Sequence, residues 1–457
     1  MKINLGSFNI RFSSSPSFLA AKLKLEALKA KVGQVARRGE ALPESSIPSQ
    51  HWGEKEWEMR RSHIADTVIF NDWDIFAFQE VIDHQYKDLA DLLGPEYDHV
   101  GVGRNDGKED GEAVPVFWKN EKFERVNQKQ GGIGEDGVEH FWLSPTPEVV
   151  GSVGWDAVLT RMCTHVSLRS IETGEILHVF STHYDHMGVL AREKSSELLV
   201  KRAREAVRST NAWISLPAQS LSEAEPLVIL IGDLNSPRNE KGWKTLVAGH
   251  YSLPESEIPS RDRDNTTFLD TAMSLRTRMR NIYLDYNEPK EDRLIATGVK
   301  ATNDPAPGLC LGQWPSDSGG GKPCLGLMTN PWGPKRTFTD FQPSPRTAVE
   351  DRIDFILLLD NGAIKDETRS DTRVRVDDLL TPLALDPSRV GAAKEAGVGR
   401  KRGVIERPSQ DADRAGSEEE KRWRIRTHGV IPNWSEGDAG FLVSDHRAVM
   451  TRIERVV

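Results

Sequence analysis

The chain contains few cysteines, which limits the covalent and metal-binding frameworks that it can use. Only 3 of its 457 residues are cysteine, at Cys163, Cys310 and Cys324. So few cysteines cannot build the disulfide scaffold that is typical of small secreted proteins. Cys310 and Cys324 lie in one segment rich in glycine and proline and could pair, but we expect isolated thiols. The spacing of histidine and cysteine does not match a structural zinc site.

A long apolar run and an excess of positive charge are also missing. No stretch of about 18 apolar residues occurs, so no transmembrane helix is expected. Lys and Arg number 60 against 69 Asp and Glu, a formal net charge of -9. Proteins that grip long nucleic acids usually carry a basic face instead. Since the first strand is expected from Ile3, no leader segment is predicted, and we expect an intracellular protein, cytoplasmic rather than nuclear.

The chain does contain ample apolar material, at 37% of residues, and one distinctive motif, LVILIGDLNS. In this motif, an apolar run from Leu227 to Ile231 predicts a strand that is buried on both faces. The run breaks at Gly232, and alternation along an extended backbone points Asp233 and Asn235 into one site. A carboxylate beside an amide suits base chemistry next to an anionic oxygen. The same pair could instead cap backbone groups in a turn.

Other strand-like segments end in polar side chains of the same kind. Each one alone could serve a cap or a core hydrogen bond, but together they indicate a shared site. The segments are SFNIR (7–11, with Asn9), IFAFQEV (75–81, with Glu80), HVFSTHYDH (178–186, with His183), RIDFILLL (352–359, with Asp354) and FLVSDHRAVM (441–450, with Asp445 and His446).

In this order, the motifs resemble those of the endonuclease/exonuclease/phosphatase superfamily of DNase I-like, metal-dependent phosphoesterases. GEAVPVFWKNEKFE (111–124) looks like the central hairpin of that family. The runs at 141–168 and 181–199 are similar to segments of a DNase I-like subgroup, so the resemblance covers most of the chain. Ser181 stands where the subgroup usually has asparagine, a departure that concerns substrate detail more than activity.

The resemblance implies an α+β fold, a four-layer α/β sandwich with two mostly antiparallel sheets packed face to face and flanked by helices. Periodicity alone predicts only a mixed α/β domain. We expect a single domain over residues 1–457, with inserts at about 13–55, 301–335 and 386–422. Helices are predicted at 56–70, 83–94 and 190–215, the second of them with Asp83 as its N-cap.

The resemblance also implies a magnesium site. Glu80 is the first choice as ligand, because a hard cation prefers carboxylate oxygens. Asn9 and Asp445 would complete or support the site, and Mn²⁺ is the alternative metal. Asp233 would activate the attacking water, and Asn235 would donate to a phosphate oxygen.

The remaining predicted site residues would contact the substrate or support those that do. His446 would contact the phosphate, with Asp354 fixing its tautomer, and His183 would donate to another oxygen. Arg161 and Arg11 are predicted to bind the substrate, although Arg161 could instead brace Asp156. For Asp185 and His186, structural support is the expected role.

These roles predict a Mg²⁺-dependent hydrolase of phosphoester bonds, a phosphodiesterase or phosphatase, that uses in-line attack by an activated water. Two alternatives remain: a nuclease, including a 3′-to-5′ RNA exonuclease resembling the deadenylases, and a non-catalytic scaffold with the same fold. The expected partner is a phosphate ester, either a small molecule or a nucleic acid. No protein partner is implied.

Overall fold

The computed structural model describes residues 1–13, 54–216, 225–247, 267–273, 337–339, 341, 352–361, 423–432, 434–435 and 441–455. The predicted inserts at about 13–55, 301–335 and 386–422 lie almost wholly outside these ranges, as do Cys310 and Cys324. The domain boundaries therefore remain predictions. Within the described ranges, no helix is both long and apolar enough to cross a membrane.

Two sheets form the centre of the fold. The first sheet consists of β1 (Lys2–Asn9), β2 (Ile75–Gln79), β3 (Tyr97–Val100), β4 (Val116–Lys119), β12 (Trp423–Val430) and β15 (Val449–Arg455). The second consists of β5 (Phe123–Arg125), β6 (Val138–Trp142), β7 (Met162–Ser170), β8 (Ile176–His183), β9 (Leu227–Asp233), β10 (Phe268–Asp270) and β11 (Asp354–Leu359).

Strand order explains how distant segments become neighbours. The first sheet runs β12-β15-β1-β2-β4-β3, and the second runs β10-β11-β9-β8-β7-β5 with β6 paired to β7. Each sheet contains one parallel pair, β1 with β2 and β8 with β9. The other pairings within these two sheets are antiparallel, as predicted for most of the fold.

The two sheets pack face to face over one apolar cluster. Leu5 and Ile75 of the first sheet meet Val179, Ile229 and Ile356 of the second sheet in this cluster. All five are at most 1% exposed. Burying one such side chain fully contributes about 1.5–3 kcal/mol, so this layer supplies much of the stability of the fold.

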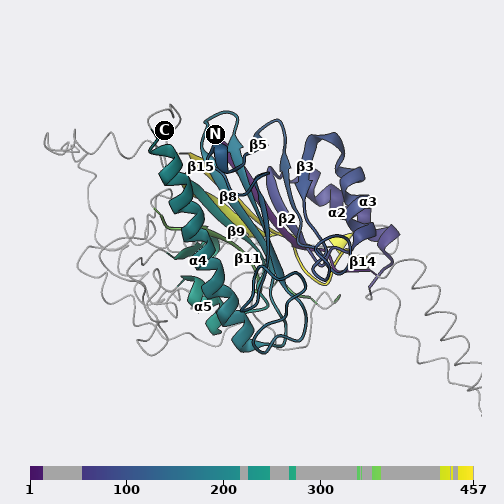
Figure 1. Ribbon diagram of the computed structural model, residues 1–457. Coiled ribbons are helices and arrows are strands. Elements are labelled where there is room, and N and C mark those ends of the chain that lie inside the picture. The colour runs from purple at the N-terminus through teal and green to yellow at the C-terminus, as the bar shows by residue number, and fades with distance from the viewer. Residues whose placement is uncertain are drawn as a thin grey trace, which may run out of the picture.

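Helices cover the outer face of each sheet. In Figure 1, α2 (Trp57–Phe70) and α3 (Asp83–Leu93) lie on one side, and α4 (Val189–Ile214) and α5 (Lys241–Val247) lie on the other. Two further apolar clusters fill these outer layers. The remaining elements are η2 (Gly94–Glu96), η3 (Gln128–Gln130), β13 (Trp434–Ser435) and β14 (Phe441–Leu442). The predicted four-layer sandwich is confirmed.

Strand β9 differs in one detail from its prediction. It continues through Gly232 to Asp233 instead of breaking at the glycine. A side chain at Gly232 would place its Cβ 2.2 Å from the carbonyl oxygen of Thr182, on the neighbouring strand β8. Glycine therefore permits the close pairing of β8 and β9 and carries the strand up to its terminal carboxylate.

The predicted helices are present, with small differences at their N-termini. Helix α2 begins one residue later than predicted, at Trp57. Helix α3 begins at Asp83 and has Ile82 as its N-cap; the Gln85 side chain accepts from the N–H of Ile82 at 3.4 Å. Asp83 is therefore not the N-cap; its carboxylate pairs with Lys87 at 2.9 Å. Helix α4 begins one residue earlier than predicted, at Val189.

Candidate active site

Strand pairing brings the polar strand ends together. Asn9 lies opposite Gln79 in the parallel pair β1–β2, and His183 lies opposite Asp233 in the parallel pair β8–β9. Strand β11 runs antiparallel to β9 and begins at Asp354, opposite Asp233. The carboxyl ends of parallel strands thus meet the amino end of an antiparallel neighbour at the same edge.

Asn9 connects the two sheets at this edge. Its amide nitrogen donates to Glu80 Oε1 and to Asp233 Oδ2, both at 3.0 Å, and lies 3.4 Å from His446 Nε2. Its amide oxygen accepts from the backbone N–H of Arg11 at 3.0 Å. Asn9 is fully buried, and a buried amide needs such partners, so these bonds fix its position.

His446 lies between two carboxylates. Its Nδ1 is hydrogen bonded to Asp354 Oδ2 at 2.9 Å, and its Nε2 lies 3.7 Å from Asp233 Oδ2. Burial lowers the pKa of His446, but the charges of Asp354 and Asp233 outweigh this effect and hold that pKa well above its usual range. The two carboxylates therefore favour the cationic form of the imidazole.

Asp233 titrates close to neutrality. Its burial and the charge of Asp354 raise its pKa to about 7, against the opposing effects of His446 and of the hydrogen bonds from Asn235 and Asn9. A carboxylate with such a pKa can accept a proton at neutral pH, which is the property required of a general base.

Glu80 and Asp445 form a second acidic group beside Arg11. Glu80 Oε2 accepts from the N–H of Phe12 at 3.2 Å and lies 3.6 Å from Arg11 Nη1. Asp445 Oδ2 lies 3.9 Å from the same nitrogen. Burial raises the pKa of Glu80, but the hydrogen bond from Asn9 and the charges of His446 and Arg11 outweigh burial and leave that pKa below its usual value.

The raised pKa of Asp445 reflects burial as well as repulsion between the carboxylates of Asp445 and Glu80. Burial raises the pKa of Asp445, and the negative charge of Glu80 adds to this effect, while His446 opposes it. Two mutually repelling buried carboxylates are stabilised by a cation between them.

Among the described residues, two acidic groups could therefore hold a divalent cation, and their donor atoms differ. In one, atoms of Asp233, Asp354 and His446 lie within 4.8 Å of one another, and one of the three donors is an imidazole nitrogen. In the other, Glu80 and Asp445 offer oxygens, with Asn9 next to Glu80. A hard cation such as Mg²⁺ prefers oxygen donors, so the second group fits it better.

Backbone strain gathers at the same strand ends. Arg11, Glu80 and Asn235 have positive φ angles of 61°, 61° and 44°. Each such residue costs on the order of 1–3 kcal/mol and persists only where its surroundings hold it. Asn235 thus reaches the site through a left-handed turn, its N–H donating to Asp233 Oδ1 at 2.9 Å, and not through simple strand alternation.

His183 is held as a neutral imidazole. Burial lowers its pKa well below the usual value, and the charge of Arg161 adds to this effect. The Asn235 amide nitrogen lies 3.0 Å from His183 Nε2 and 3.0 Å from the carbonyl oxygen of Tyr184, so both amide hydrogens are engaged. His183 Nδ1 then carries the proton; it lies 3.7 Å from Glu112 and has no hydrogen-bond partner in the described part of the chain.

Glu112 belongs to this site, although the sequence analysis did not single it out. Its two carboxylate oxygens accept from both terminal nitrogens of Arg104, at 2.7 and 3.0 Å. Burial raises the pKa of Glu112 against the charge of Arg104. Glu112 directly precedes an apolar run at 113–118, the same signal that marked the other site residues, so this pattern and the hairpin resemblance at 111–124 could both have indicated it.

Arg161 lies beside Glu112 with unused hydrogen-bond donors. Its Nη1 lies 3.8 Å from Glu112 and its Nε lies 3.8 Å from Asp185; among the described residues, neither nitrogen has a hydrogen-bond partner. Asp156, which Arg161 could have braced, accepts instead from the N–H groups of Leu190 and Ala191 at the start of α4. Asp156 thus caps this helix.

Asp185 is hydrogen bonded to the backbone, as expected for a residue that supports the structure of the site. Its carboxylate accepts from four backbone N–H groups at 2.7–3.2 Å, which belong to Val158, Leu159, Met187 and Gly188. His186 Nδ1 lies 3.4 Å from Arg161 Nη2.

Close contacts therefore join all the predicted site residues into one network, in which their roles stay predictions. These residues are Asn9, Arg11, Glu80, Arg161, His183, Asp233, Asn235, Asp354, Asp445 and His446.

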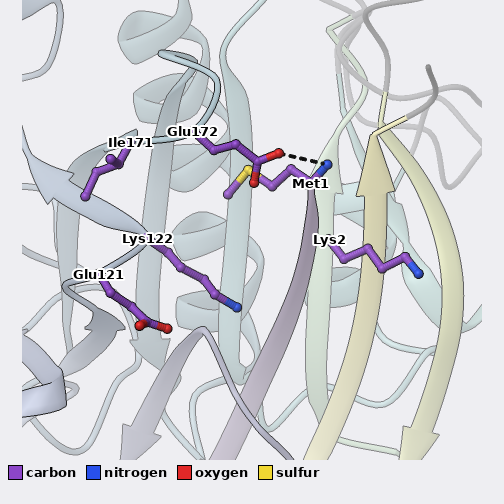
Figure 2. A pocket seen from close by; sticks show the side chains of 6 residues that line it. All are labelled: Met1, Lys2, Glu121, Lys122, Ile171 and Glu172. Carbon is purple, nitrogen blue, oxygen red and sulfur yellow. Dashed lines mark ion pairs between the residues drawn. The ribbon is translucent and has the colours of Figure 1, made fainter.

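A separate cavity lies at the other end of strand β1. It measures about 420 Å³ and is lined by Met1, Lys2, Glu121, Lys122, Ile171 and Glu172 (Figure 2). Glu172 lies 3.4 Å from the terminal amine of Met1, as the dashed line in Figure 2 marks. The polar network lies at Asn9, where β1 ends, so this cavity is not the candidate active site.

Comparison of the sequence with models of protein families and with curated proteins finds no match. Solved structures do match. An endonuclease/exonuclease/phosphatase from Bacteroides vulgatus has a TM-score of 0.52 and 18% identity, over 100% of this chain and 99% of that one. An endonuclease/exonuclease/phosphatase family protein from Bacteroides thetaiotaomicron has a TM-score of 0.51 and 19% identity, over 99% and 97% of the two chains.

A third structure, a functionally unknown conserved protein from Enterococcus faecalis, is similar to the same extent. Its TM-score is 0.50 and its identity 14%, over 99% of this chain and 100% of that one. At such low identity, these likenesses establish the fold. The predicted resemblance is therefore confirmed at the level of the fold.

Proposed function

We propose that the chain is a metal-dependent hydrolase of phosphoester bonds that works by in-line attack of an activated water. The observation that carries this proposal is the position of Asn9. Its amide nitrogen lies within 3.4 Å of two carboxylates, Glu80 and Asp233, and of the imidazole of His446. The fold shared with solved endonuclease/exonuclease/phosphatase proteins supports the same class of reaction.

Asp233 is the general base in this proposal. With a pKa of about 7, it can hold and deprotonate a water near neutral pH. The hydrogen bonds from Asn9 and from the N–H of Asn235 fix both of its oxygens. The attacking water thus meets a carboxylate of defined orientation.

Three side chains would stabilise the phosphate. His446 brings a positive charge that Asp354 maintains through the 2.9 Å hydrogen bond. His183 would donate from Nδ1, and Arg161 from Nε or Nη1, which have no hydrogen-bond partner among the described residues. Donors that are held in place before the substrate arrives are effective where negative charge grows during the reaction. Asn235, whose amide hydrogens bond to His183 and Tyr184, acts in this arrangement by orienting His183.

Glu80 and Asp445, with Asn9 beside Glu80, would hold Mg²⁺, with Mn²⁺ as the alternative. When bound, the cation neutralises negative charge on the phosphate and on the leaving oxygen. The net charge of -9 favours small phosphate esters over long nucleic acids as substrates.

A panel assay tests the proposal. Single-stranded RNA, abasic duplex DNA, inositol phosphates, sphingomyelin and a bis-aryl phosphate would be offered with Mg²⁺ and, separately, with a chelator. We expect hydrolysis of at least one ester, which the chelator stops and Asp233→Asn abolishes. Asp98→Asn, an exposed aspartate on β3, is the matched control and should leave the rate unchanged. A wild-type chain that cleaves none of them, or that cleaves equally in chelator, contradicts the proposal.

A further inference from the structure

Arg11 lies in contact with three carboxylates at the edge of the site. Its Nη1 lies 3.6 Å from Glu80 and 3.9 Å from Asp445, and its Nε lies 3.8 Å from Glu54. Glu80 and Asp445 are nearly buried, at 11% and 8% side-chain exposure, whereas Glu54 is 42% exposed. The guanidinium therefore lies between an inner acidic pair and an outer acidic side chain.

Hydrogen bonds fix the backbone of Arg11, whereas its guanidinium is held by long ion contacts and by a cation–π contact with Phe12, at 4.6 Å from the ring centroid. The carbonyl oxygen of Arg11 accepts from Gln85 Nε2 at 3.1 Å and from Arg60 Nη2 at 3.2 Å, and these bonds hold a residue whose φ is 61°. All three contacts of the guanidinium with carboxylates are longer than a hydrogen bond. The charged end can thus move without any change in the backbone.

We infer that Arg11 is an internal counter-ion that competes with the divalent cation for Glu80 and Asp445 and turns toward Glu54 when the cation binds. The inference rests on the proposed function in one respect: the cation must bind at Glu80 and Asp445. It assigns Glu54 a role as the outer partner of Arg11. It also explains how one arginine can neutralise the inner carboxylates and still contact the substrate phosphate, since metal binding frees its guanidinium.

If Arg11 competes in this way, removing the charge of Arg11 and removing the charge of Glu54 should change Mg²⁺ affinity in opposite directions. Removing the charge of Arg11 eliminates the competitor, so Mg²⁺ should bind more tightly. Removing the charge of Glu54 leaves Arg11 with only its inner partners, so Mg²⁺ should bind more weakly. Without Arg11, however, Glu54 has no arginine to attract, and its removal should then have little effect.

A calorimetric titration of the full chain with Mg²⁺ alone, after removal of metal with a chelator, tests this inference. We expect Arg11→Gln to tighten Mg²⁺ binding at least about threefold and Glu54→Gln to weaken it at least about twofold. The double variant should match Arg11→Gln. Arg11→Lys, which keeps the charge, should stay within about twofold of the wild type. Arg61→Gln, which removes an exposed arginine paired with Asp88, is the control and should have no effect.

The inference is overturned if Arg11→Gln leaves Mg²⁺ affinity unchanged or weakens it, or if Glu54→Gln has its full effect in the double variant. It is also overturned if the wild type does not bind Mg²⁺. Thermal unfolding of each variant shows that it is folded, and Arg11→Met is a second neutral variant should Arg11→Gln not fold. The titration contains no substrate, so its outcome is separate from whether the chain cleaves phosphoesters.

Discussion

The Nδ1 atom of His446 and the Oδ2 atom of Asp354 are joined by a 2.9 Å hydrogen bond that connects the two sheets of the sandwich. Asp354 begins β11 of the second sheet, and His446 lies just before β15 of the first sheet. Both residues are buried. Removing one member of a buried ion pair leaves an uncompensated charge, so each residue depends on the other.

Asp354→Asn should lower both activity and stability. Without the carboxylate, the pKa of His446 falls, and kcat should drop about 100-fold or more because the cationic imidazole is lost. The free energy of unfolding should fall by about 3 kcal/mol. Steady-state kinetics and NMR titration of the imidazole measure these effects. If the variant retains the wild-type pKa of His446, the assigned role of Asp354 is wrong.

The rate should depend on pH through Asp233. A general base acts only when it is deprotonated, and the pKa of this carboxyl is raised to about 7 by burial and by Asp354. We expect kcat/KM to rise between about pH 6 and pH 8 and then to level off. A pH–rate profile on a neutral ester, whose own ionisation does not change in this range, measures it. A flat profile would show that another group is the base.

Asp233→Asn should stabilise the metal-free protein above neutral pH. The folded-state pKa of about 7 lies above the ordinary value of 3.8, so the folded state prefers the protonated form. The stability contributed by this carboxyl is present below about pH 4 and is lost as the pH rises through about 7. The neutral amide should therefore raise the free energy of unfolding by about 1–3 kcal/mol at pH 8, and by little at pH 4. Denaturant unfolding in the presence of a chelator at the two pH values measures the difference, and equal effects at both would contradict it.

Glu112→Gln should weaken substrate binding. The change removes the charge that holds Arg104, and it removes a carboxylate that lies 3.8 Å from Arg161 and 3.7 Å from His183 Nδ1. We expect KM to rise about tenfold and the free energy of unfolding to fall by about 1–3 kcal/mol. Glu124→Gln, which removes the exposed partner of Arg169, is the matched control and should cost about 0–1 kcal/mol. If the two variants changed KM and the free energy of unfolding equally, Glu112 would not contribute to substrate binding as described.

The members of the site could be recognised in the sequence for a physical reason, whereas the four-layer fold came from the family resemblance. Each of these residues, such as Asp233 and Asp354, adjoins an apolar run, and strands that pair in one sheet bring their ends together. Such a pattern is local and visible along the chain. The parallel pairing of β8 with β9, which places His183 opposite Asp233, was not predicted, because periodicity does not specify which strands pair.

The remaining features depend on long-range contacts that no local pattern marks. Glu112 adjoins an apolar run, but its contacts with Arg104 and Arg161, which lie in loops on either side of it in the sequence, are not visible in that pattern. Asp156 caps helix α4 across a separation of more than thirty residues. The inward direction of Arg11 depends on a left-handed backbone that Gln85 and Arg60 hold in place.

Whether Asp233 and His446 act together on one substrate is measured most directly by a double-mutant cycle on Mg²⁺-dependent hydrolysis of the best ester of the panel. Their side chains come from different sheets and lie 3.7 Å apart. We predict that Asp233→Asn and His446→Ala each reduce kcat at least about 1000-fold, and that the double variant is no worse than the poorer single one, since groups that act as a unit are not additive. Full activity in either single variant, or losses that multiply in the double variant, would contradict a single catalytic cluster.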